Sequence, residues 1–475
     1  MIAMKGTDMS TVSHRLAVHA VADHTVSPEL AEWMRLLLLD YHAITGGGFH
    51  RDSAVAARAA VEISEQPTAF FPAALHGVDG AGKSGFATVE SAALVNGITA
   101  HGLELDDTFE ESSLHPGVVI FPAVLALAST RQSLTGEVLR AAIVGYDVMC
   151  TVGVLLGARE SYGRGFHPTG VAGCLGAAAA AARLLGLTVE QTAHALGLAA
   201  NMASGSLEFL ADGSWTKRLN AGHAAATGIR AAKLAAAGFT APATAIEGRD
   251  GFLVQYGAGV VEGRQLALEF GRSALDTSIK FYPCCRYMHG NIDLLRDIRE
   301  QNPELGIDDV ARIRVGVIRA GASLVSEPAA RKLVVNTPVD AQFNMPFGAA
   351  VALATGRATV DQFDDAPAVA AELMEWMEKV ECYRSDSLEA AFPARWQAEV
   401  QVVLRNGTVI EKSENSFRGA PGDRATWADI VQKAEGLIGA PAAKALAASV
   451  SELDDSTVLG GGVAVPRDTL TASRA

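Results

Sequence analysis

Apolar residues recur at helical spacing through most of the first 275 residues. Residues 27–43 begin with a proline and an acidic residue just inside the start, and their apolar positions follow a helical period. Similar stretches rich in Ala, Leu and Gly cover residues 88–105, 121–128, 134–156, 170–187, 188–204 and 221–237. Because polar residues are sparse in them, we expect burial on more than one face. Such helices must pack closely on one another or against a second subunit.

The pattern changes near Asp276. Residues 309–319 alternate apolar and polar side chains, which predicts a half-buried strand. Residues 342–353 return to a helical pattern. Residues 396–416 form two alternating runs joined by Asn406-Gly407, a strong β-hairpin signal. Residues 426–437 and 441–453 are amphipathic and predict two closing helices.

The predicted fold class is therefore mainly α, with a large all-helical domain and a smaller α+β lid domain. The helical domain is expected over residues 1–275, completed by C-terminal helices at about 416–455. The lid domain is expected over residues 276–415. Residues 456–475 have no periodicity and are predicted to form a flexible tail.

Composition narrows the class of protein. A chain of 475 residues exceeds what one hydrophobic core usually serves, so two domains are the default. A net charge of −14 argues against nucleic acid or an anionic membrane surface as a partner. Five cysteines without a C-x-x-C pair predict reduced thiols, a cytoplasmic location and no metal site. The most apolar window, residues 170–187, is rich in Ala and contains Arg183, which favours a buried core helix over a membrane span.

Residues 77–84 read GVDGAGKS, a complete match to the nucleotide-binding pattern G-x-x-x-x-G-K-S. A true P-loop lies between a buried strand and a helix that begins at its Lys-Ser. Here Pro72 precedes the motif, Gly85 follows it, and no strand is expected on either side. We therefore predict a solvated surface loop, and a nucleotide hydrolase using Lys83 stays a remote alternative.

Two polar segments in the helical part carry candidates for acid–base chemistry. Residues 101–117 place an acidic cluster, with Asp107 and Thr108 at its end, before His115. Residues 162–173 place His167 just before a helix, whose unpaired N–H groups would attract a carboxylate. Taken singly, the acids are as readily solvated or helix caps, and His167 is more readily a packed core residue. Together they indicate a site for proton transfer.

Two further segments carry cations. Lys217 and Arg218 precede another helix of small residues. The run KFYPCCRYMH places Lys280, Cys285 and Arg286 together with His289 at the predicted domain junction, where a cleft would be lined. No activating partner follows Cys284 or Cys285, so a buried structural thiol is the simpler interpretation. Cations of this kind would bind carboxylates and stabilise an enediolate-like charge.

These segments, in this order, resemble the MmgE/PrpD superfamily. The likeness rests on NGITAHGLELDDT…LHPG, GFHPTGVAGCLGAAAAAARLLGL, the TKRLNAGHAAATGIRAAKLAAAGFTAP…EGRDGF run, KFYPCCRYMH and AQFNMPFGAAVALATG. The resemblance implies a cofactor-free homodimer with the active site between a helical domain and a lid. It also implies residues near the substrate: Asp107, His115, His167, Lys217, Lys280 and His289.

Two positions depart from the family pattern. Members of the decarboxylase branch carry His where this chain has Cys285, and Asp is common where it has Glu104. These departures argue against cis-aconitate decarboxylation without excluding it.

The expected function is proton abstraction α to a carboxylate of a small di- or tricarboxylic acid, without a cofactor or a metal. A 2-methylcitrate dehydratase-like lyase is preferred, with an iminodisuccinate-type epimerase or a cis-aconitate-type decarboxylase as alternatives. A helical binding protein without catalytic activity is a third possibility, beside the enzyme and the nucleotide hydrolase. The predicted catalytic residues are His115, His167, Lys217 and Asp107. The predicted substrate-binding residues are Lys280, Arg286, His289, Thr108, Arg218 and Cys285.

Overall fold

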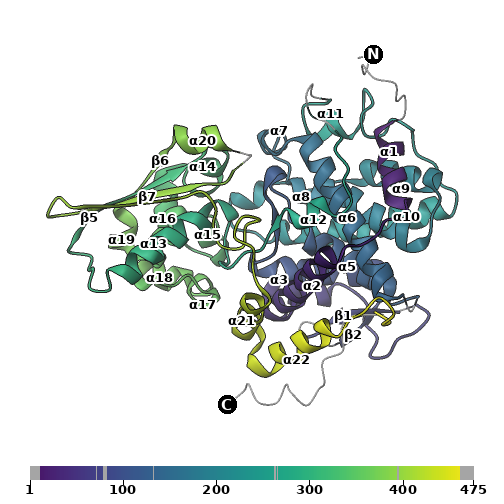
Figure 1. The fold of residues 1–475 in the computed structure, drawn as a ribbon, viewed down its shortest axis with the longest axis horizontal. Helices are drawn as coiled ribbons and strands as arrows, with labels where there is room; N and C mark the ends of the chain where they lie inside the picture. The colour runs from purple at the N-terminus through teal and green to yellow at the C-terminus, as the bar shows by residue number, and fades with distance from the viewer. Residues whose placement is uncertain are drawn as a thin grey trace.

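The computed structural model describes residues 11–70, 72–78, 83–131, 133–260, 264, 266–392 and 395–459. Over these residues the chain forms 22 α-helices and eight strands, most of them short, so the predicted mainly α class is confirmed. Figure 1 shows the four-stranded sheet and its helices on one side of the molecule and the large helical part on the other.

The helical part holds most of the long helices. They are α1 (Val12–Val21), α2 (Pro28–Gly48), α3 (Asp52–Ala59), α4 (Val89–Ala100), α5 (Gly117–Ala128), α6 (Thr135–Leu156), α7 (Ala158–Gly163), α8 (Pro168–Leu185), α9 (Val189–Met202), α10 (Thr216–Ala236), α11 (Phe252–Tyr256) and α12 (Arg272–Leu275). The chain returns to this part through α21 (Trp427–Ile438) and α22 (Ala440–Ser451), and α21 packs against α2. We call residues 11–281 and 425–459 the helical body.

The helical body has its own hydrophobic core, built mainly from α2, α4, α5, α6, α8, α9 and α10. Small residues let these helices approach closely, as predicted. A Cβ atom added at Gly222 of α10 would lie 2.2 Å from the carbonyl oxygen of Leu94 on α4. The chain therefore places glycine where two helix backbones come into contact.

Two described helices, α6 and α8, are long and apolar enough to span a membrane by length and composition. Both are mostly buried in the core, which is what the interior helix of a large folded protein shows. Of the predicted buried window 170–187, residues 170–182 are buried, while residues 183–187 at its end are partly exposed.

Residues 282–414, which we call the sheet region, form a second hydrophobic core. Their helices are α13 (His289–Gln301), α14 (Arg319–Val325), α15 (Pro338–Gln342), α16 (Met345–Thr355), α17 (Val360–Asp364), α18 (Ala366–Glu372), α19 (Met374–Glu378) and α20 (Asp386–Ala391). The strands are β5 (Val310–Val317), β6 (Val380–Arg384), β7 (Ala398–Leu404) and β8 (Val409–Glu414), and α13 and α16 pack against the sheet.

The sheet has the strand order β6-β5-β7-β8. β5 runs parallel to β6 and antiparallel to β7, and β7 and β8 form a hairpin. The hairpin turns at Gly407, whose φ of 89° suits glycine. The predicted strand at 309–319 and the hairpin at 396–416 are confirmed.

The surroundings of GVDGAGKS correct one sequence-based expectation. A strand does precede the motif: β1 (Ala73–His76) pairs antiparallel with β2 (Lys83–Ala87). We missed β1 because all four of its residues are buried, which removes the alternation that marks a strand. Residues 79–82 lie outside the described residues. Because Lys83 and Ser84 begin a strand instead of a helix, the motif lacks the helix N-terminus that cradles phosphate in a P-loop.

The C-terminal boundary also differs from the prediction. Val458 forms a bridge with Leu134, and the Leu459 N–H donates to the carbonyl oxygen of Ser133. Ser456 and Val458 are exposed but Leu459 is buried, so the chain stays in contact with the helical body as far as residue 459. Residues 460–475 lie outside the described residues. The other predicted domain boundaries stay predictions.

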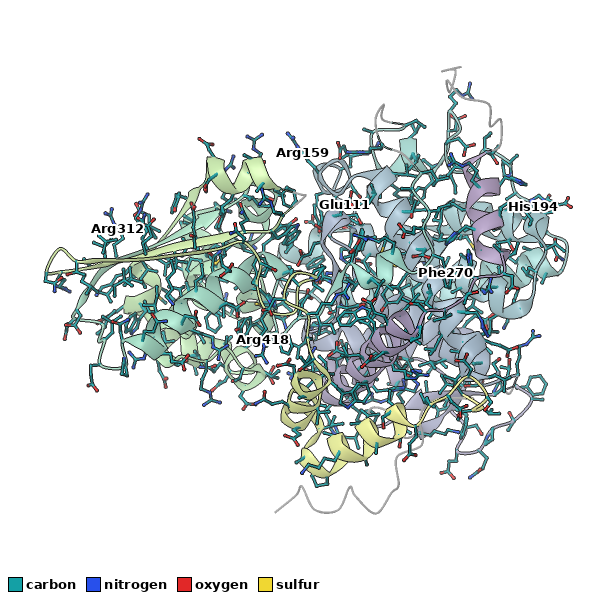
Figure 2. The ribbon with its side chains drawn as sticks, viewed as in Figure 1. Glu111, Arg159, His194, Phe270, Arg312 and Arg418 are labelled. Atoms are coloured by element: carbon teal, nitrogen blue, oxygen red, sulfur yellow. The ribbon has the colours of Figure 1, made fainter. Side chains whose placement is uncertain are left out.

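Arg418 lies near the junction of the two parts (Figure 2). Its guanidinium donates to Asp429 of α21 at 2.8 Å and lies 4.0 Å from the ring centroid of Phe281. Its backbone N–H donates to Asp293 of α13. Arg418 therefore joins the closing helix of the helical body to the sheet region.

Candidate active site

A pocket lies where the helical body meets the sheet region, with about 440 Å³ of empty space that is partly open to solvent. Its polar lining comes from Glu104, Thr108, Ser113, His115, Tyr162, His167, Lys217, Cys285, Arg286 and Tyr287. Its apolar lining comes from Leu207, Phe209, Leu324, Phe343 and Trp396. Residues far apart in the sequence, from 104 to 396, therefore build one cavity.

Glu104 organises the cationic side of this pocket. It ends a short 3₁₀ turn in the left-handed region, with φ 57°, a conformation that costs a non-glycine residue energy and is often found at functional sites. Its carboxylate accepts from Lys217, and the Lys280 ammonium lies 3.0 Å from the same oxygen. Burial alone would raise the pKa of Glu104, but Lys217 and Lys280 hold it well below its ordinary value.

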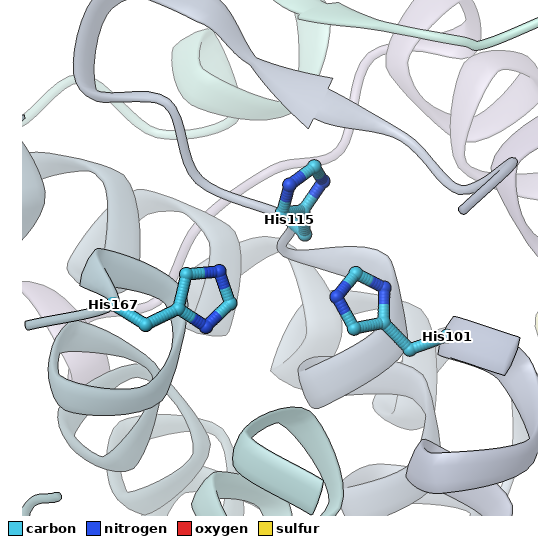
Figure 3. A group of neighbouring side chains, drawn as sticks. All are labelled: His101, His115 and His167. Atoms are coloured by element: carbon cyan, nitrogen blue, oxygen red, sulfur yellow. The ribbon is translucent and has the colours of Figure 1, made fainter. Parts of the chain in front are cut away.

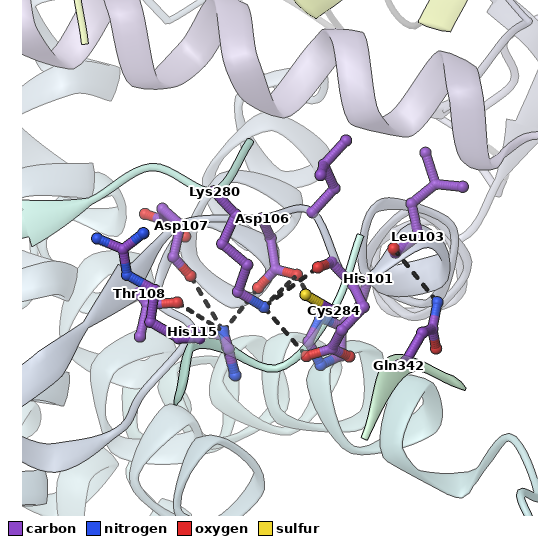
Figure 4. A network of polar contacts seen from close by, with 12 residues as sticks. His101, Leu103, Asp106, Asp107, Thr108, His115, Lys280, Cys284 and Gln342 are labelled. Atoms are coloured by element: carbon purple, nitrogen blue, oxygen red, sulfur yellow. Dashed lines mark hydrogen bonds and ion pairs between the residues drawn. The ribbon is translucent and has the colours of Figure 1, made fainter. Parts of the chain in front are cut away.

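Asp106 stands behind two histidines and has no exposed surface (Figure 4). One of its oxygens lies 3.0 Å from His101 Nδ1, and the other lies 2.8 Å from His115 Nδ1. Burial alone would raise the pKa of Asp106, but His101, Lys280 and His115 lower it well below its ordinary value. Asp106 is therefore an anion that holds both rings in place.

The contacts of His115 assign its tautomer. Its Nδ1 faces Asp106, the carbonyl oxygen of Asp107 at 3.1 Å and the Thr108 hydroxyl at 3.4 Å. Because the carboxylate and the carbonyl can only accept, Nδ1 carries the hydrogen and Nε2 keeps its lone pair. Burial lowers the pKa of His115 to about 4, so the ring is neutral near pH 7 and can accept a proton.

His167 has the opposite tautomer. The Asn220 Nδ2 lies 3.3 Å from the carbonyl oxygen of Ser206, which assigns that atom as the amide nitrogen. The same nitrogen lies 3.3 Å from His167 Nδ1, so Nδ1 accepts and Nε2 carries the hydrogen. Burial lowers the pKa of His167 well below its ordinary value, and Lys217 lowers it further. His167 is therefore a neutral hydrogen-bond donor.

His101, His115 and His167 converge, with one ring nitrogen from each within 4.8 Å of the others (Figure 3). Three imidazoles at this spacing could hold a zinc-like ion. The donor set fits such an ion poorly, because Asn220 fixes a hydrogen on His167 Nε2 and the Lys217 ammonium lies close by. We interpret the cluster as a proton-transfer group, and the absence of a metal stays a prediction.

Arg286 is the cation that the sheet region brings to the pocket. Its Nε donates to Glu110 at 2.9 Å, and Glu110 in turn accepts from the Ser278 hydroxyl at 2.7 Å. The side chain is 2% exposed, yet its Nη2 has no hydrogen-bond partner within the described residues. A buried guanidinium N–H without an acceptor is costly, so this atom is suited to a substrate carboxylate.

Four of the predicted site residues do not line the pocket. Lys280 has no exposed surface and lies beneath Glu104 and Asp106. His289 faces the carbonyl oxygen of Cys284. Arg218 donates to the carbonyl oxygen of Gly102 and to Gln342. Lys280, Arg218 and His289 therefore support the site from behind.

Asp107 is the fourth of these residues, and its carboxylate is engaged elsewhere. One oxygen accepts from the Gly117 N–H at the start of α5, and the other accepts from the Tyr146 hydroxyl at 2.7 Å. Burial raises the pKa of Asp107 to about 7, against these two hydrogen bonds. The contact that Asp107 makes with the site is through its backbone, whose carbonyl orients His115.

Cys285 lines the pocket as a neutral thiol. Burial raises its pKa, so the thiolate needed for nucleophilic attack is disfavoured. Its neighbour Cys284 is fully buried, and burial raises the pKa of that thiol well above its ordinary value. These findings agree with the structural interpretation of the pair.

Sequence reasoning missed the roles of His101 and Asp106. Both stand in the motif HGLELDD, but the choice between adjacent acids depends on which one the turn after Glu104 directs toward the histidines. The spacing of His101 and Asp106, five residues apart, carries no periodic signal that could have shown their contact. Phe209, Phe343 and Trp396 were missed because an isolated aromatic residue in a sequence resembles any core residue.

Comparison with known proteins now identifies the family. Residues 15–262 match the MmgE/PrpD N-terminal domain and residues 282–455 match the MmgE/PrpD C-terminal domain. The chain is 27% identical over 320 residues to a cis-aconitate decarboxylase-like protein, oryM, of Aspergillus oryzae, covering 63% of this chain and 66% of that protein. It is 30% identical over 230 residues to a cis-aconitate decarboxylase of Aspergillus terreus, covering 45% and 46%.

A cis-aconitate decarboxylase of Homo sapiens is 27% identical over 343 residues, covering 69% of this chain and 68% of the human protein. The chain spans less than two thirds of the length of the two Aspergillus relatives. The two domain matches together extend over most of the sequence, and the chain therefore belongs to the MmgE/PrpD family.

Proposed function

We propose that this protein is a lyase that takes a proton from the carbon α to a carboxylate of a small di- or tricarboxylic acid, with dehydration of a hydroxy acid as its reaction. The observation that carries the proposal is the pairing of opposite tautomers: His115 offers a lone pair and His167 offers an N–H on the lining of one pocket. A base and a hydrogen-bond donor beside two cations are what enolisation of a carboxylate requires.

The cations bind the substrate and stabilise the charge that develops. Arg286 has an unpartnered Nη2 for one carboxylate, and the Lys217 ammonium lines the pocket beside it. The carboxylate whose α-carbon loses the proton becomes an enediolate in the transition state. His167 Nε2–H can donate to this oxygen while it stays neutral, as an oxyanion-hole donor does.

His115 moves the proton. Its Nε2 takes the α-hydrogen, and Asp106 stabilises the imidazolium that forms. The same proton can then pass to the departing hydroxyl oxygen. The C–H and C–O bonds break, a C=C bond forms and water leaves, so His115 returns to its neutral state. Bound substrate carboxylates would raise the pKa of His115 from about 4 and make it a stronger base.

Decarboxylation is the second candidate, favoured by the names of the relatives, which are cis-aconitate decarboxylases. It would use the same cations but would end with a proton delivered to carbon as CO₂ leaves. An epimerase would return the proton to the opposite face of the same carbon. We therefore propose incubating the protein with 2-methylcitrate, cis-aconitate and iminodisuccinate in D₂O and following the products by NMR. Loss of water from 2-methylcitrate supports the dehydratase.

Variants of the two histidines test the roles of their side chains. We expect His115→Ala to lower kcat by about 10²–10⁴-fold, the usual contribution of a general base. His167→Ala should lower kcat by about 10²–10³-fold, as loss of an oxyanion donor does. His50→Ala is the matched control, because His50 is exposed and outside the pocket. Near-wild-type turnover in His115→Ala, with an unchanged circular dichroism spectrum, would refute its assignment as the base.

A further inference from the structure

Three hydroxyl side chains on the pocket lining contact one another and have no part in the proposed proton transfer. They are Ser113 and Tyr162 of the helical body and Tyr287 of the sheet region. The Ser113 Oγ lies 2.9 Å from the Tyr287 hydroxyl oxygen, and the Tyr162 hydroxyl is also within hydrogen-bonding reach of Ser113. We call these three residues the hydroxyl cluster. It joins the two parts of the protein across one pocket.

Ser113 has a strained backbone conformation. Its φ of 53° lies in the left-handed region, which costs energy for any residue other than glycine and is often found at functional sites. Two contacts hold the turn: the Ser113 N–H donates to the carbonyl oxygen of Glu110 at 3.2 Å, and Leu114 forms a bridge with Phe109. The strained turn places the Ser113 hydroxyl on the pocket lining, two residues before His115.

The ring of Tyr287 is held from the sheet region. It stacks on Trp396, with ring centroids 4.5 Å apart and planes 10° apart. A Cβ atom added at Gly321 of α14 would lie 3.1 Å from the same ring, closer than an ordinary contact. Because Trp396 and α14 pack this tightly on the ring, the direction of the Tyr287 hydroxyl is fixed.

The hydroxyl cluster is uncharged. Burial raises the pKa of the Tyr287 hydroxyl and raises that of Tyr162 well above its ordinary value. Both tyrosines therefore keep their hydrogens near pH 7. The cluster differs in this respect from Lys217 and Arg286, the cations that line the same pocket.

A count of hydrogens shows what the cluster offers to a ligand. Three hydroxyls carry three hydrogens, and their contacts with one another use two at most. Within the part of the chain that the structure describes, these hydroxyls have no other acceptor. At least one O–H is free to donate to a ligand, and lone pairs are free to accept from one. A carboxylate can only accept, whereas a hydroxyl group can use both.

We infer that the hydroxyl cluster binds the hydroxyl group of a hydroxy acid, the group that leaves as water in the proposed dehydration. This inference rests on the proposed function and names the residues that select its substrates. The carboxylates of the acid would bind Lys217 and Arg286. An O–H of the cluster would donate to the departing oxygen while His115 supplies the proton, so the cluster itself neither gains nor loses a proton.

The test compares two acids that differ by one hydroxyl group: 2,2-dimethylsuccinate and 2,2-dimethyl-3-hydroxysuccinate. The hydroxy acid cannot lose water, because the carbon next to its C–OH carries no hydrogen. Dissociation constants are measured by isothermal titration calorimetry with the wild-type protein and with each enantiomer of the hydroxy acid. The better enantiomer should bind about two- to tenfold tighter than 2,2-dimethylsuccinate, which is the gain expected from one hydrogen bond.

Variants that remove one hydroxyl locate the effect. Tyr287→Phe keeps the stacked ring and should abolish the preference for the hydroxy acid, with the affinity for 2,2-dimethylsuccinate unchanged. Ser113→Gly should act in the same way, and its fold should persist because glycine suits the left-handed backbone. Tyr383→Phe is the matched control, because the Tyr383 hydroxyl donates to Glu399 and does not line the pocket. The comparison of acids on the wild-type protein stands even where a variant fails to fold.

Three results would overturn the inference. If the wild-type protein binds both acids equally, the inference is wrong while the proposed function stands. If Tyr287→Phe and Ser113→Gly weaken the binding of both acids equally, the cluster holds a carboxylate and the inference is again wrong. If neither acid binds, the inference is wrong, and the proposed function falls with it only where 2-methylcitrate is not turned over either.

Discussion

Where they meet, the helical body and the sheet region differ in how their polar side chains are paired. In the helical body, Asp106 links His101 and His115, and Glu104 links Lys217 to Lys280. These contacts form one buried network around the histidines. Among the described residues that line the pocket, the sheet region brings one cation, Arg286, which has an unpartnered N–H, and its other contributions are neutral or apolar.

This difference separates two tasks. A connected network fixes which nitrogen carries a hydrogen and which side chain is charged, and proton transfer depends on both. Unpartnered donors and apolar surface do not move protons, but they select what binds. We therefore expect substitutions in the helical body to lower kcat and those in the sheet region to change KM and selectivity.

We expect the largest effect from removing a buried ion pair next to the network, and the quantity that changes is the free energy of unfolding. Lys433 on α21 pairs with Asp40 at 2.6 Å and donates to the carbonyl oxygen of Leu105 at 2.7 Å. Lys433→Met leaves Asp40 buried without its cation, so the free energy of unfolding should fall by about 3–5 kcal/mol. Urea denaturation measures the change, with the exposed Lys444→Met as control. A loss below about 1 kcal/mol would contradict this role.

Lys217 tests whether the helical body carries the chemistry. Lys217→Met removes a cation from the pocket, but Glu104 keeps Lys280 as its partner, so the fold should persist. We expect kcat to fall by about 10²–10³-fold, the usual cost of one donor to a developing oxyanion. Steady-state kinetics with 2-methylcitrate measure it. A rise in KM at unchanged kcat would instead assign Lys217 to ground-state binding and weaken the division of tasks.

Arg286 is the pocket cation of the sheet region, as Lys217 is that of the helical body. Arg286→Met should raise KM by about 10–10²-fold, because a charged hydrogen bond contributes about 1.5–3 kcal/mol. Its effect on kcat should be smaller than that of Lys217→Met. The variant also leaves Glu110 with the Ser278 hydroxyl alone, so its melting temperature should be measured beside its kinetics. Equal losses of kcat in Lys217→Met and Arg286→Met would contradict the assignment of catalysis to the helical body and binding to the sheet region.

The pH dependence should reflect the buried state of the network. The pKa of His115 is about 4, so its base form persists to lower pH than that of an ordinary histidine, and the acid limb of kcat/KM should lie below pH 6. At alkaline pH activity should fall before pH 10.5, because burial lowers the pKa of Lys217. An acid limb near the ordinary histidine pKa would show that His115 is not the group that titrates.

The pH dependence of folding stability should also reflect the titration of His115. Between about pH 6.5 and 4 the unfolded chain binds a proton at His115 that the folded protein does not bind. The contribution of His115 to folding stability is therefore lost as the pH falls through this window. His115→Gln should flatten the dependence of the urea midpoint on pH, while His50→Gln should leave it unchanged.

The smallest effect is expected at GVDGAGKS. Lys83 is exposed on β2, with its Nζ 5.5 Å from the ring centroid of Phe86. Lys83→Ala should change the unfolding free energy by less than about 0.5 kcal/mol and leave turnover unchanged. A thermal-shift titration with ATP and Mg²⁺ should show no stabilisation. Stabilisation that depends on Lys83 would revive the nucleotide-binding alternative.

Several features were predictable because they are local. The hairpin at 396–416 follows from Asn-Gly between two alternating runs, and the capping box of α9 follows from Thr188 and Gln191. Six of the ten predicted site residues line the pocket: Thr108, His115, His167, Lys217, Cys285 and Arg286. Asp107 was preferred to Asp106, because the sequence does not show which of two adjacent carboxylates faces α5 and which faces the histidines.

The sequence by itself determined the helices, the strand-and-hairpin pattern and the set of residue types that a carboxylate-binding site needs, because these depend on periodicity, turn chemistry and charge. Tertiary structure decided the rest. It brought His101, His115 and His167 together, gave His115 and His167 opposite tautomers, and lined the same pocket with apolar residues from both parts of the chain. These properties depend on contacts between residues tens to hundreds of positions apart, for which a single sequence carries no local signal.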